Sequence, residues 1–151
     1  MGSIDLINNF VDGVKVKLNA ANVELGGFTK ISERDEDPSA LVRTKSYLPI
    51  LIVIPLADRP DRIRWTMGGD EVYHDFSISI VGYYIFSDID TALRTLRGYG
   101  FNCMDLFRGD NSMIGGCHIY SATLDVGYFV LENFPIYRFV LTMNVKSIEL
   151  E

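Results

Sequence analysis

Two long segments near the C-terminus, residues 118–131 and 136–148, alternate apolar and polar residues with a period of two. Successive side chains of a strand point to opposite faces, so this period predicts strands with one apolar and one polar face. The break at 133–135 is short enough for an antiparallel pair. The apolar positions are Tyr120, Ala122, Leu124, Val126, Tyr128 and Val130 in the first segment, and Tyr137, Phe139, Leu141, Met143 and Val145 in the second.

A hairpin is predicted upstream of this pair. Arg62, Ile63, Arg64, Trp65, Thr66 and Met67 alternate in character, and Gly68-Gly69-Asp70 makes the turn. The return strand, within 74–84, places Phe76, Ile78, Ile80 and Gly82 on one face and Ser77, Ser79 and Val81 on the other. We expect this second face to meet water or a partner. Before the hairpin, the apolar run 48–56 predicts a strand buried on both faces.

Two amphipathic helices are predicted from spacings of three and four residues. Ser3 and Ser87 are the expected N-caps, and Gly98 and Gly100 are expected to bend or split the second helix. Residues 21–46, between the first helix and the first strand, predict a long loop. The apolar positions are Ile4, Ile7, Phe10, Val11, Val14 and Leu18 in the first helix, and Ile89, Ala92, Leu93, Leu96, Cys103 and Leu106 in the second.

The order of these elements is α-β-β-β-α-β-β. No strand–helix–strand unit repeats, so a parallel doubly wound sheet is not expected. The predicted fold class is α+β, an antiparallel sheet with helices packed on it. A length of 151 residues suits one domain over 1–151.

The chain is acidic, with a net charge of −6. A dedicated nucleic-acid binder usually carries a basic face, so that class is disfavoured, whereas a surface past which DNA slides is compatible with acidity. Cys103 and Cys117 are expected to be free thiols of a protein made and kept in a cytoplasm. The longest apolar run, 48–56, is far shorter than the ~20 residues of a membrane-spanning helix, and no signal peptide is evident.

The sequence contains no recognisable catalytic, cofactor or metal motif. Residues 26–30 lack the spacing of a phosphate-binding loop. His74, His118 and the two cysteines lack the close spacing of zinc ligands. His74 and Asp75 are adjacent on a strand and therefore point to opposite faces, which disfavours a hydrolase triad. We expect a protein that is not an enzyme, although a small-molecule-binding or catalytic α+β domain stays open as an alternative.

The predicted hairpin is the candidate subunit or tube interface. Opposite charges are interleaved there, with Trp65 on the other face, and arginine and tryptophan are enriched among interface hot spots. Against this, tryptophan at such a position is more often a core residue, and Trp65 is better explained as one. The candidate contact residues are Arg59, Asp61, Arg62, Arg64, Asp70 and Glu71.

Four segments give the sequence a resemblance to the tail terminator proteins of long-tailed bacteriophages, which are also called tail completion or head–tail joining proteins. The resemblance is one of pattern and order, and it covers 48–150 well and 4–20 loosely. The loop 21–46 has no clear counterpart in the family. The four segments are Asp75–Gly82, Asp90–Leu96, Asp125–Glu132 and Ile136–Val145.

The resemblance implies a structural virion protein made in the host cytoplasm. Such a protein forms a ring of six copies that terminates the tail tube and joins the tail to the head connector. Its implied partners are further copies of itself, the tail tube protein, the connector or neck protein, and a sheath protein if the tail is contractile. DNA would pass through the lumen without specific binding, and no membrane or cofactor is implied. Another neck or head-completion protein is the nearest alternative.

Overall fold

A long, mainly antiparallel sheet is the centre of the structure, a computed structural model that describes residues 3–28, 30–33, 49–55, 64–68, 71–86, 88–131 and 134–150. The strands of the described residues are β1 (Lys30–Glu33), β2 (Ile50–Pro55), β3 (Arg64–Gly68), β4 (Glu71–Tyr84), β5 (Met113–Ile114), β6 (Cys117–Leu131) and β7 (Phe134–Leu150). They pair in the order β1-β2-β4-β7-β6-β5, and β3 also pairs with β4. Only β1 and β2 pair in parallel.

The α+β class is confirmed, and the predicted element order is matched approximately. Two short strands, β1 and β5, were not predicted. β1 lies inside the segment 21–46 that the sequence suggested was a loop, as does the 3-10 turn η1 (Val23–Leu25). Strands of four and two residues are too short to show a period, so they depend on pairing with β2 and β6.

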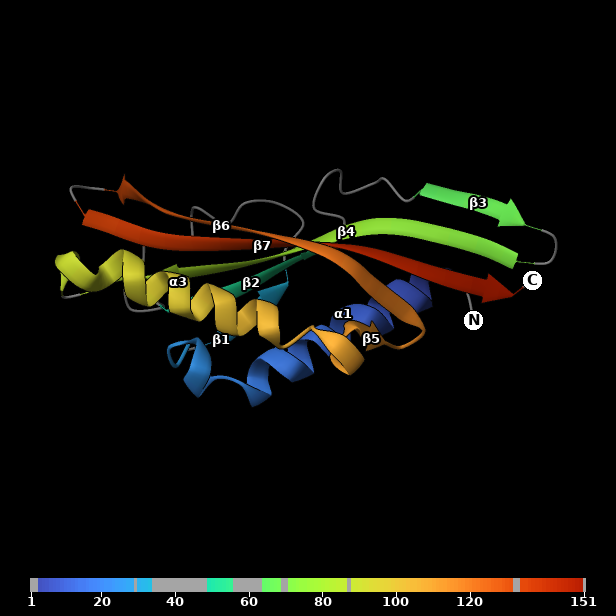
Figure 1. Cartoon of the computed structure of the whole chain (residues 1–151), viewed down its shortest axis with the longest axis horizontal. Coiled ribbons are helices and arrows are strands. Elements are labelled where there is room, and N and C mark those ends of the chain that lie inside the picture. Colours follow the sequence, from blue (N-terminus) through green and yellow to red (C-terminus); the bar gives the residue numbers. More distant parts are fainter. Residues whose placement is uncertain are drawn as a thin grey trace.

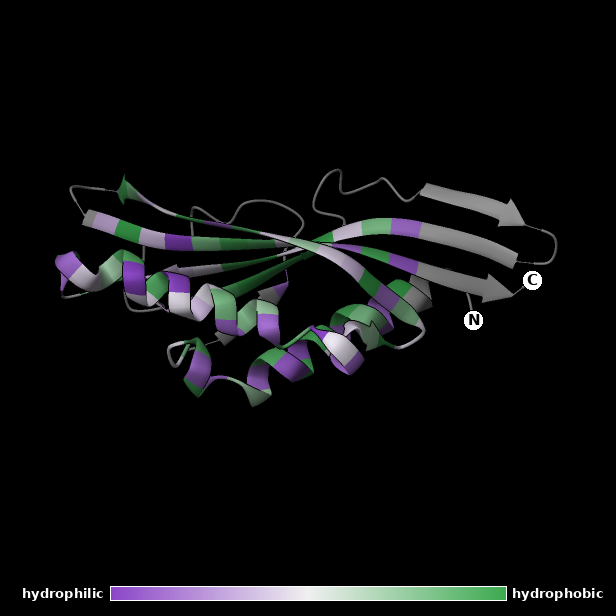
Figure 2. Cartoon of the chain, viewed as in Figure 1, coloured by the Kyte–Doolittle hydropathy of each residue, from purple (hydrophilic) through white to green (hydrophobic). Residues whose placement is uncertain are grey.

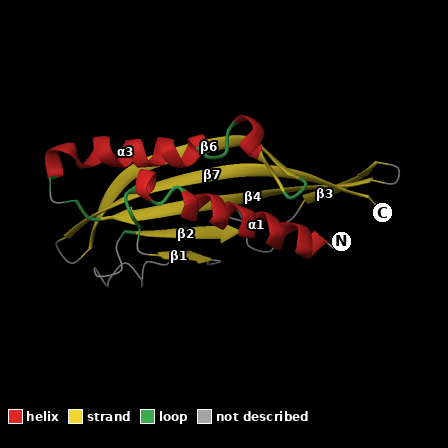
Figure 3. Ribbon diagram, turned by 90° about the horizontal axis from the view of Figure 1, so that it is seen from below, coloured by secondary structure: helices red, strands yellow, loops and turns green. Residues whose placement is uncertain are grey.

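Two helices, α1 (Ser3–Ala20) and α3 (Ile89–Asp105), pack on the same face of the sheet (Figures 1 and 3). Hydrophilic and hydrophobic residues alternate along both (Figure 2). Within the described chain, no helix is both long and apolar enough to cross a membrane. The apolar stripe of α1 is buried as predicted, apart from Ile4, whose side chain is outside the described residues: Ile7, Phe10, Val11, Val14 and Leu18.

The second helix differs from its prediction at both its start and its middle. The N-cap is Asp88, whose side chain accepts a hydrogen bond from the backbone N–H of Asp90 at 3.1 Å, and Ser87 is outside the described residues. The glycines do not interrupt α3. Gly100 instead faces β6, where a Cβ atom would lie 3.0 Å from the side chain of Leu124. A glycine at this position allows the helix to approach the sheet closely.

The face of β4 that was expected to meet water or a partner is buried within the chain. Ser77 and Ser79 are 8% and 6% exposed. The Ser77 hydroxyl donates to Oδ1 of Asn144 at 2.8 Å, and the hydroxyls of Ser79 and Thr142 lie 3.1 Å apart. That prediction is therefore wrong here, and the buried hydroxyls replace their hydrogen bonds to water with bonds to β7.

Candidate interaction surface

The predicted hairpin is present in the backbone. Arg64–Gly68 runs antiparallel to the start of β4, and Gly68 lies opposite Glu71. The side chains of Arg64 and Glu71 are outside the described residues, as is the side chain of Trp65. The other four candidate contact residues, Arg59, Asp61, Arg62 and Asp70, lie wholly outside the described residues. The proposed role of this hairpin as a contact therefore remains a prediction.

The described residues show little that could do acid–base or nucleophilic chemistry. Cys103 and Cys117 are both free and both buried, and burial raises the pKa of the Cys103 thiol well above its ordinary value. Burial, followed by the nearby Cys103 and Tyr99, also raises the pKa of Tyr84, whose hydroxyl donates to the backbone oxygen of Leu25 at 2.6 Å. Nucleophilic thiols need the thiolate form, so Cys103 is a core residue. Among the described residues, no three His, Cys, Asp or Glu side chains are grouped to hold a metal ion.

The longest exposed feature of the described chain is the outer edge of β6. β6 pairs with β7 along its length, but on its other side β5 covers only Cys117 and His118. From Ile119 to Leu131, no described strand pairs with this outer edge. In an antiparallel pair every second residue turns its N–H and C=O away from the partner strand, so this edge presents a row of unpaired backbone groups.

Side chains on β6 are correspondingly more exposed than the alternating pattern predicted. Leu124 and Val126 are only partly buried, while Tyr128 and Val130 are 60% and 64% exposed. The register with β7 shifts between Ile119 and Ser121, and this bulge leaves Tyr120 extra and 53% exposed. The period of two identified which residues share a face, but an edge strand has a neighbour on one side only and buries less.

One flank of α3 lies beside this edge and carries several apolar side chains, together with the exposed Arg97 one turn from Leu93. Counted from Leu93, Gly100 follows after seven residues and Met104 after eleven. These spacings place the three residues on one stripe of the helix. Gly100 packs against Leu124, and Met104 lies in a groove with β6, so this stripe faces β6. Leu93 and its neighbour one turn earlier, Ile89, were predicted to be core residues but are 40% and 66% exposed.

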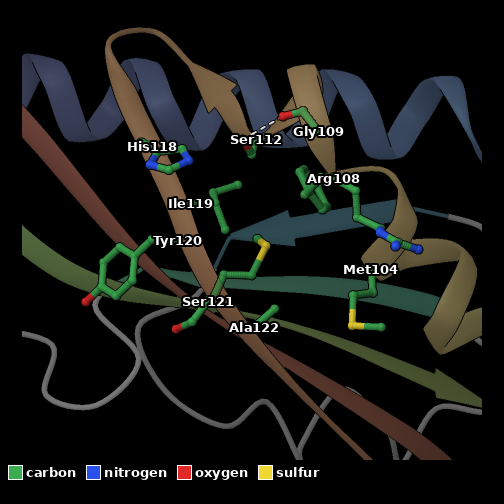
Figure 4. A pocket seen from close by; sticks show the side chains of 11 residues that line it. Met104, Arg108, Gly109, Ser112, His118, Ile119, Tyr120, Ser121 and Ala122 are labelled. Carbon is green, nitrogen blue, oxygen red and sulfur yellow. Dashed lines mark hydrogen bonds between the residues drawn. The ribbon is translucent and has the colours of Figure 1, made fainter.

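An open groove of about 460 Å³ lies at one end of this surface. Met104 and Arg108 border it from the end of α3, and residues 118–122 of β6 border it from the other side (Figure 4). The 3-10 turn η3 (Gly109–Ser112) closes one end, where the Ser112 hydroxyl donates to the Gly109 carbonyl at 2.7 Å. Arg108 is paired with Asp105 at 2.9 Å. The groove continues the apolar surface between α3 and β6.

Comparison with known proteins does not assign the chain to a family. A scan against protein-family models gave no match, and a search of curated proteins gave none. The resemblance to tail terminator proteins therefore remains a prediction from sequence pattern.

Proposed function

We propose that this chain is a structural virion protein that forms a ring of six copies at the end of a bacteriophage tail tube. The ring terminates the tube and joins it to the head connector, and DNA passes through its lumen. The four segments that carry the family resemblance support this proposal. Apart from Glu132, which is outside the described residues, they fall in β4, the first half of α3, β6 and β7, which lie together in one sheet-and-helix unit.

The observation that carries the proposal is the surface that the fold leaves open. The outer edge of β6 and the flank of α3 beside it are long and apolar, and the described residues place no cluster of catalytic groups there. Surfaces of this kind support assembly with another chain. The net charge of −6 is compatible with a lumen that repels phosphate and lets DNA slide.

The proposal is tested by assembly and by tube binding. Purified protein, examined by native mass spectrometry and negative-stain imaging, is expected to form sixfold rings, at least when tail tubes are added, and to occupy tube ends. A protein that stays monomeric and never binds tube ends would contradict the proposal. Labelled protein found only on the portal side of the neck would assign it to another neck or head-completion role.

The hairpin makes a second prediction. Replacing Arg62 and Arg64 together with glutamate is expected to weaken ring assembly while leaving the monomer folded, because hot-spot arginines lose their partners when their charge is reversed. Ring formation is followed by native mass spectrometry and folding by circular dichroism. The charge-matched control is Lys15→Glu with Lys17→Glu on α1, which changes the net charge equally. It also removes the contacts of Lys15 with Glu33 at 2.9 Å and of Lys17 with Asn111 at 3.2 Å, so its folding is measured in the same way. Unchanged assembly of the arginine variant would remove the hairpin from the interface.

A further inference from the structure

Five of the large apolar side chains that are exposed in the described chain lie on α3 and on the helix-facing side of β6. We call them the α3–β6 strip. The other four are elsewhere: Val16, Val23 and Met113 are on separate elements, and Tyr120 points to the other face of the sheet, where its ring meets Lys146 at 5.8 Å. The strip consists of Ile89 (66% exposed), Leu93 (40%), Phe101 (52%), Tyr128 (60%) and Val130 (64%).

The size of the strip approaches that of a protein interface. If a full side chain of this kind presents about 200 Å², the five exposed fractions amount to roughly 560 Å². The largest exposed apolar patch of a typical monomer is about 300 to 600 Å², and a stable protein–protein contact buries about 800 Å² on each partner. The strip is at the upper end of the first range, and the backbone edge of β6 adds to it. The surface therefore suits a folded partner.

The strand of the strip, β6, lacks the features by which natural edge strands avoid pairing with other chains. Natural edge strands are commonly short, or carry lysine, proline or bulges that block pairing. Between Ser121 and Leu131 the chain has no lysine, arginine or proline, and its one charged residue is Asp125. The bulge at Tyr120 is at the beginning of the strand and leaves these eleven residues regular. Such an edge is suited to receive a strand.

The chain itself offers a strand that could be added. The described sheet ends at β1 on the side opposite β6, and no described strand pairs with the outer edge of β1 either. As far as the described strands go, each copy thus carries a receiving edge at β6 and an edge without a strand partner at β1. A chain with a net charge of −6 repels its own copies except where charge is sparse, and the strand of the strip is such a region.

We infer that the α3–β6 strip binds a second copy of this chain, with a strand of that copy added to the outer edge of β6 between Ser121 and Leu131 and its apolar side chains packed on the flank of α3. This inference rests on the proposed function for its place in a ring, because it names the surface through which copies meet. Its chemistry, backbone pairing combined with apolar packing, does not require a tail tube.

The test compares two double variants of the full chain. Tyr128→Lys with Val130→Lys places two charges in the strip, whereas Val16→Lys with Val23→Lys places them on valines of α1 and η1 that are more exposed than the two strip residues. Native mass spectrometry and sedimentation of the unmodified protein are expected to show association between copies. The strip variant is expected to associate about 30-fold or more weakly, the effect of losing one hot-spot residue, and the control to associate normally.

Residue-resolved hydrogen exchange separates strand addition from simple side-chain contact. In the assembled protein, every second amide between Ser121 and Leu131 is expected to become protected, and this protection is expected to disappear in the strip variant. Circular dichroism reports folding. If the lysine variant unfolds, Val130→Thr, which keeps the branched shape and favours strands, is expected to weaken association by a smaller factor.

The inference is overturned if the unmodified protein is monomeric at its highest soluble concentration, if the strip variant associates as the control does, or if the β6 amides exchange equally in monomer and assembly. These results are distinguishable from failure of the proposed function. Copies that pair through β6 but never bind tube ends would sustain the inference and contradict the tail role. If the strip variant still forms rings on tube ends, the tail role is sustained and the inference is contradicted.

Discussion

Replacing Phe139 with alanine is expected to destabilise the fold by about 3 to 5 kcal/mol, enough to unfold a marginally stable domain. Phe139 is fully buried in β7, opposite Gly82 on β4 and Val126 on β6. Its ring lies directly over Gly82, where a Cβ atom would come within 2.4 Å of it, and 6.0 Å from the ring of Tyr84. Truncation therefore opens a cavity at the centre of the sheet. Urea denaturation followed by circular dichroism measures the loss.

The contact with Gly82 gives this prediction an internal control. Gly82→Ala alone is expected to cost about 1 to 3 kcal/mol, because the added methyl collides with the ring. In the Phe139→Ala background the same change is expected to cost less, because the added methyl then meets the ring of Tyr84, at 2.8 Å, but no longer that of Phe139. A double-mutant cycle should give a coupling energy of about 0.5 to 3 kcal/mol. Strict additivity would show that Gly82 and Phe139 do not share this space.

Raising the pH above about 9 to 10 is expected to destabilise the protein steeply. The pKa of Tyr84 and that of Cys103 are both raised by burial. The unfolded chain releases these protons at the ordinary values, about 8.5 for cysteine and 10 for tyrosine, while the folded chain keeps them. The unfolded state then binds fewer protons, so stability is complete below these values and falls as pH rises toward the raised ones. Between its ordinary and its raised pKa, each group lowers the free energy of unfolding by about 1.4 kcal/mol per pH unit.

Slopes of unfolding free energy against pH, and not absolute stabilities, test this prediction. Tyr84→Phe also removes the hydrogen bond to Leu25, so it is expected to lower stability by about 1 to 2 kcal/mol at every pH. Above pH 10, Tyr84→Phe and Cys103→Ala are each expected to remove one group's share of the slope, and the double variant both shares. A double variant with the slope of the unmodified protein would show that other groups control alkaline unfolding.

The fold class was within reach of the sequence because its signals are local. Period-two alternation over 118–131 and 136–148 identified two long strands. Spacings of three and four residues identified the apolar stripe of α1. The run 48–56 was correctly predicted to be buried on both faces, as residues 50–53 show. These patterns depend only on which side chains must leave water, and each is written in a few neighbouring residues.

The position of each strand in the sheet was decided by tertiary structure. Alternation predicts the same two-faced strand for β4 and for β6, yet β4 lies between neighbours and buries even Ser77 and Ser79, while β6 is at the edge and exposes Tyr128 and Val130. Similarly, helical spacing could not show that Leu93 is left 40% exposed. Strand order and helix placement depend on contacts between residues far apart in sequence, so the α3–β6 strip emerges only when the sheet is assembled.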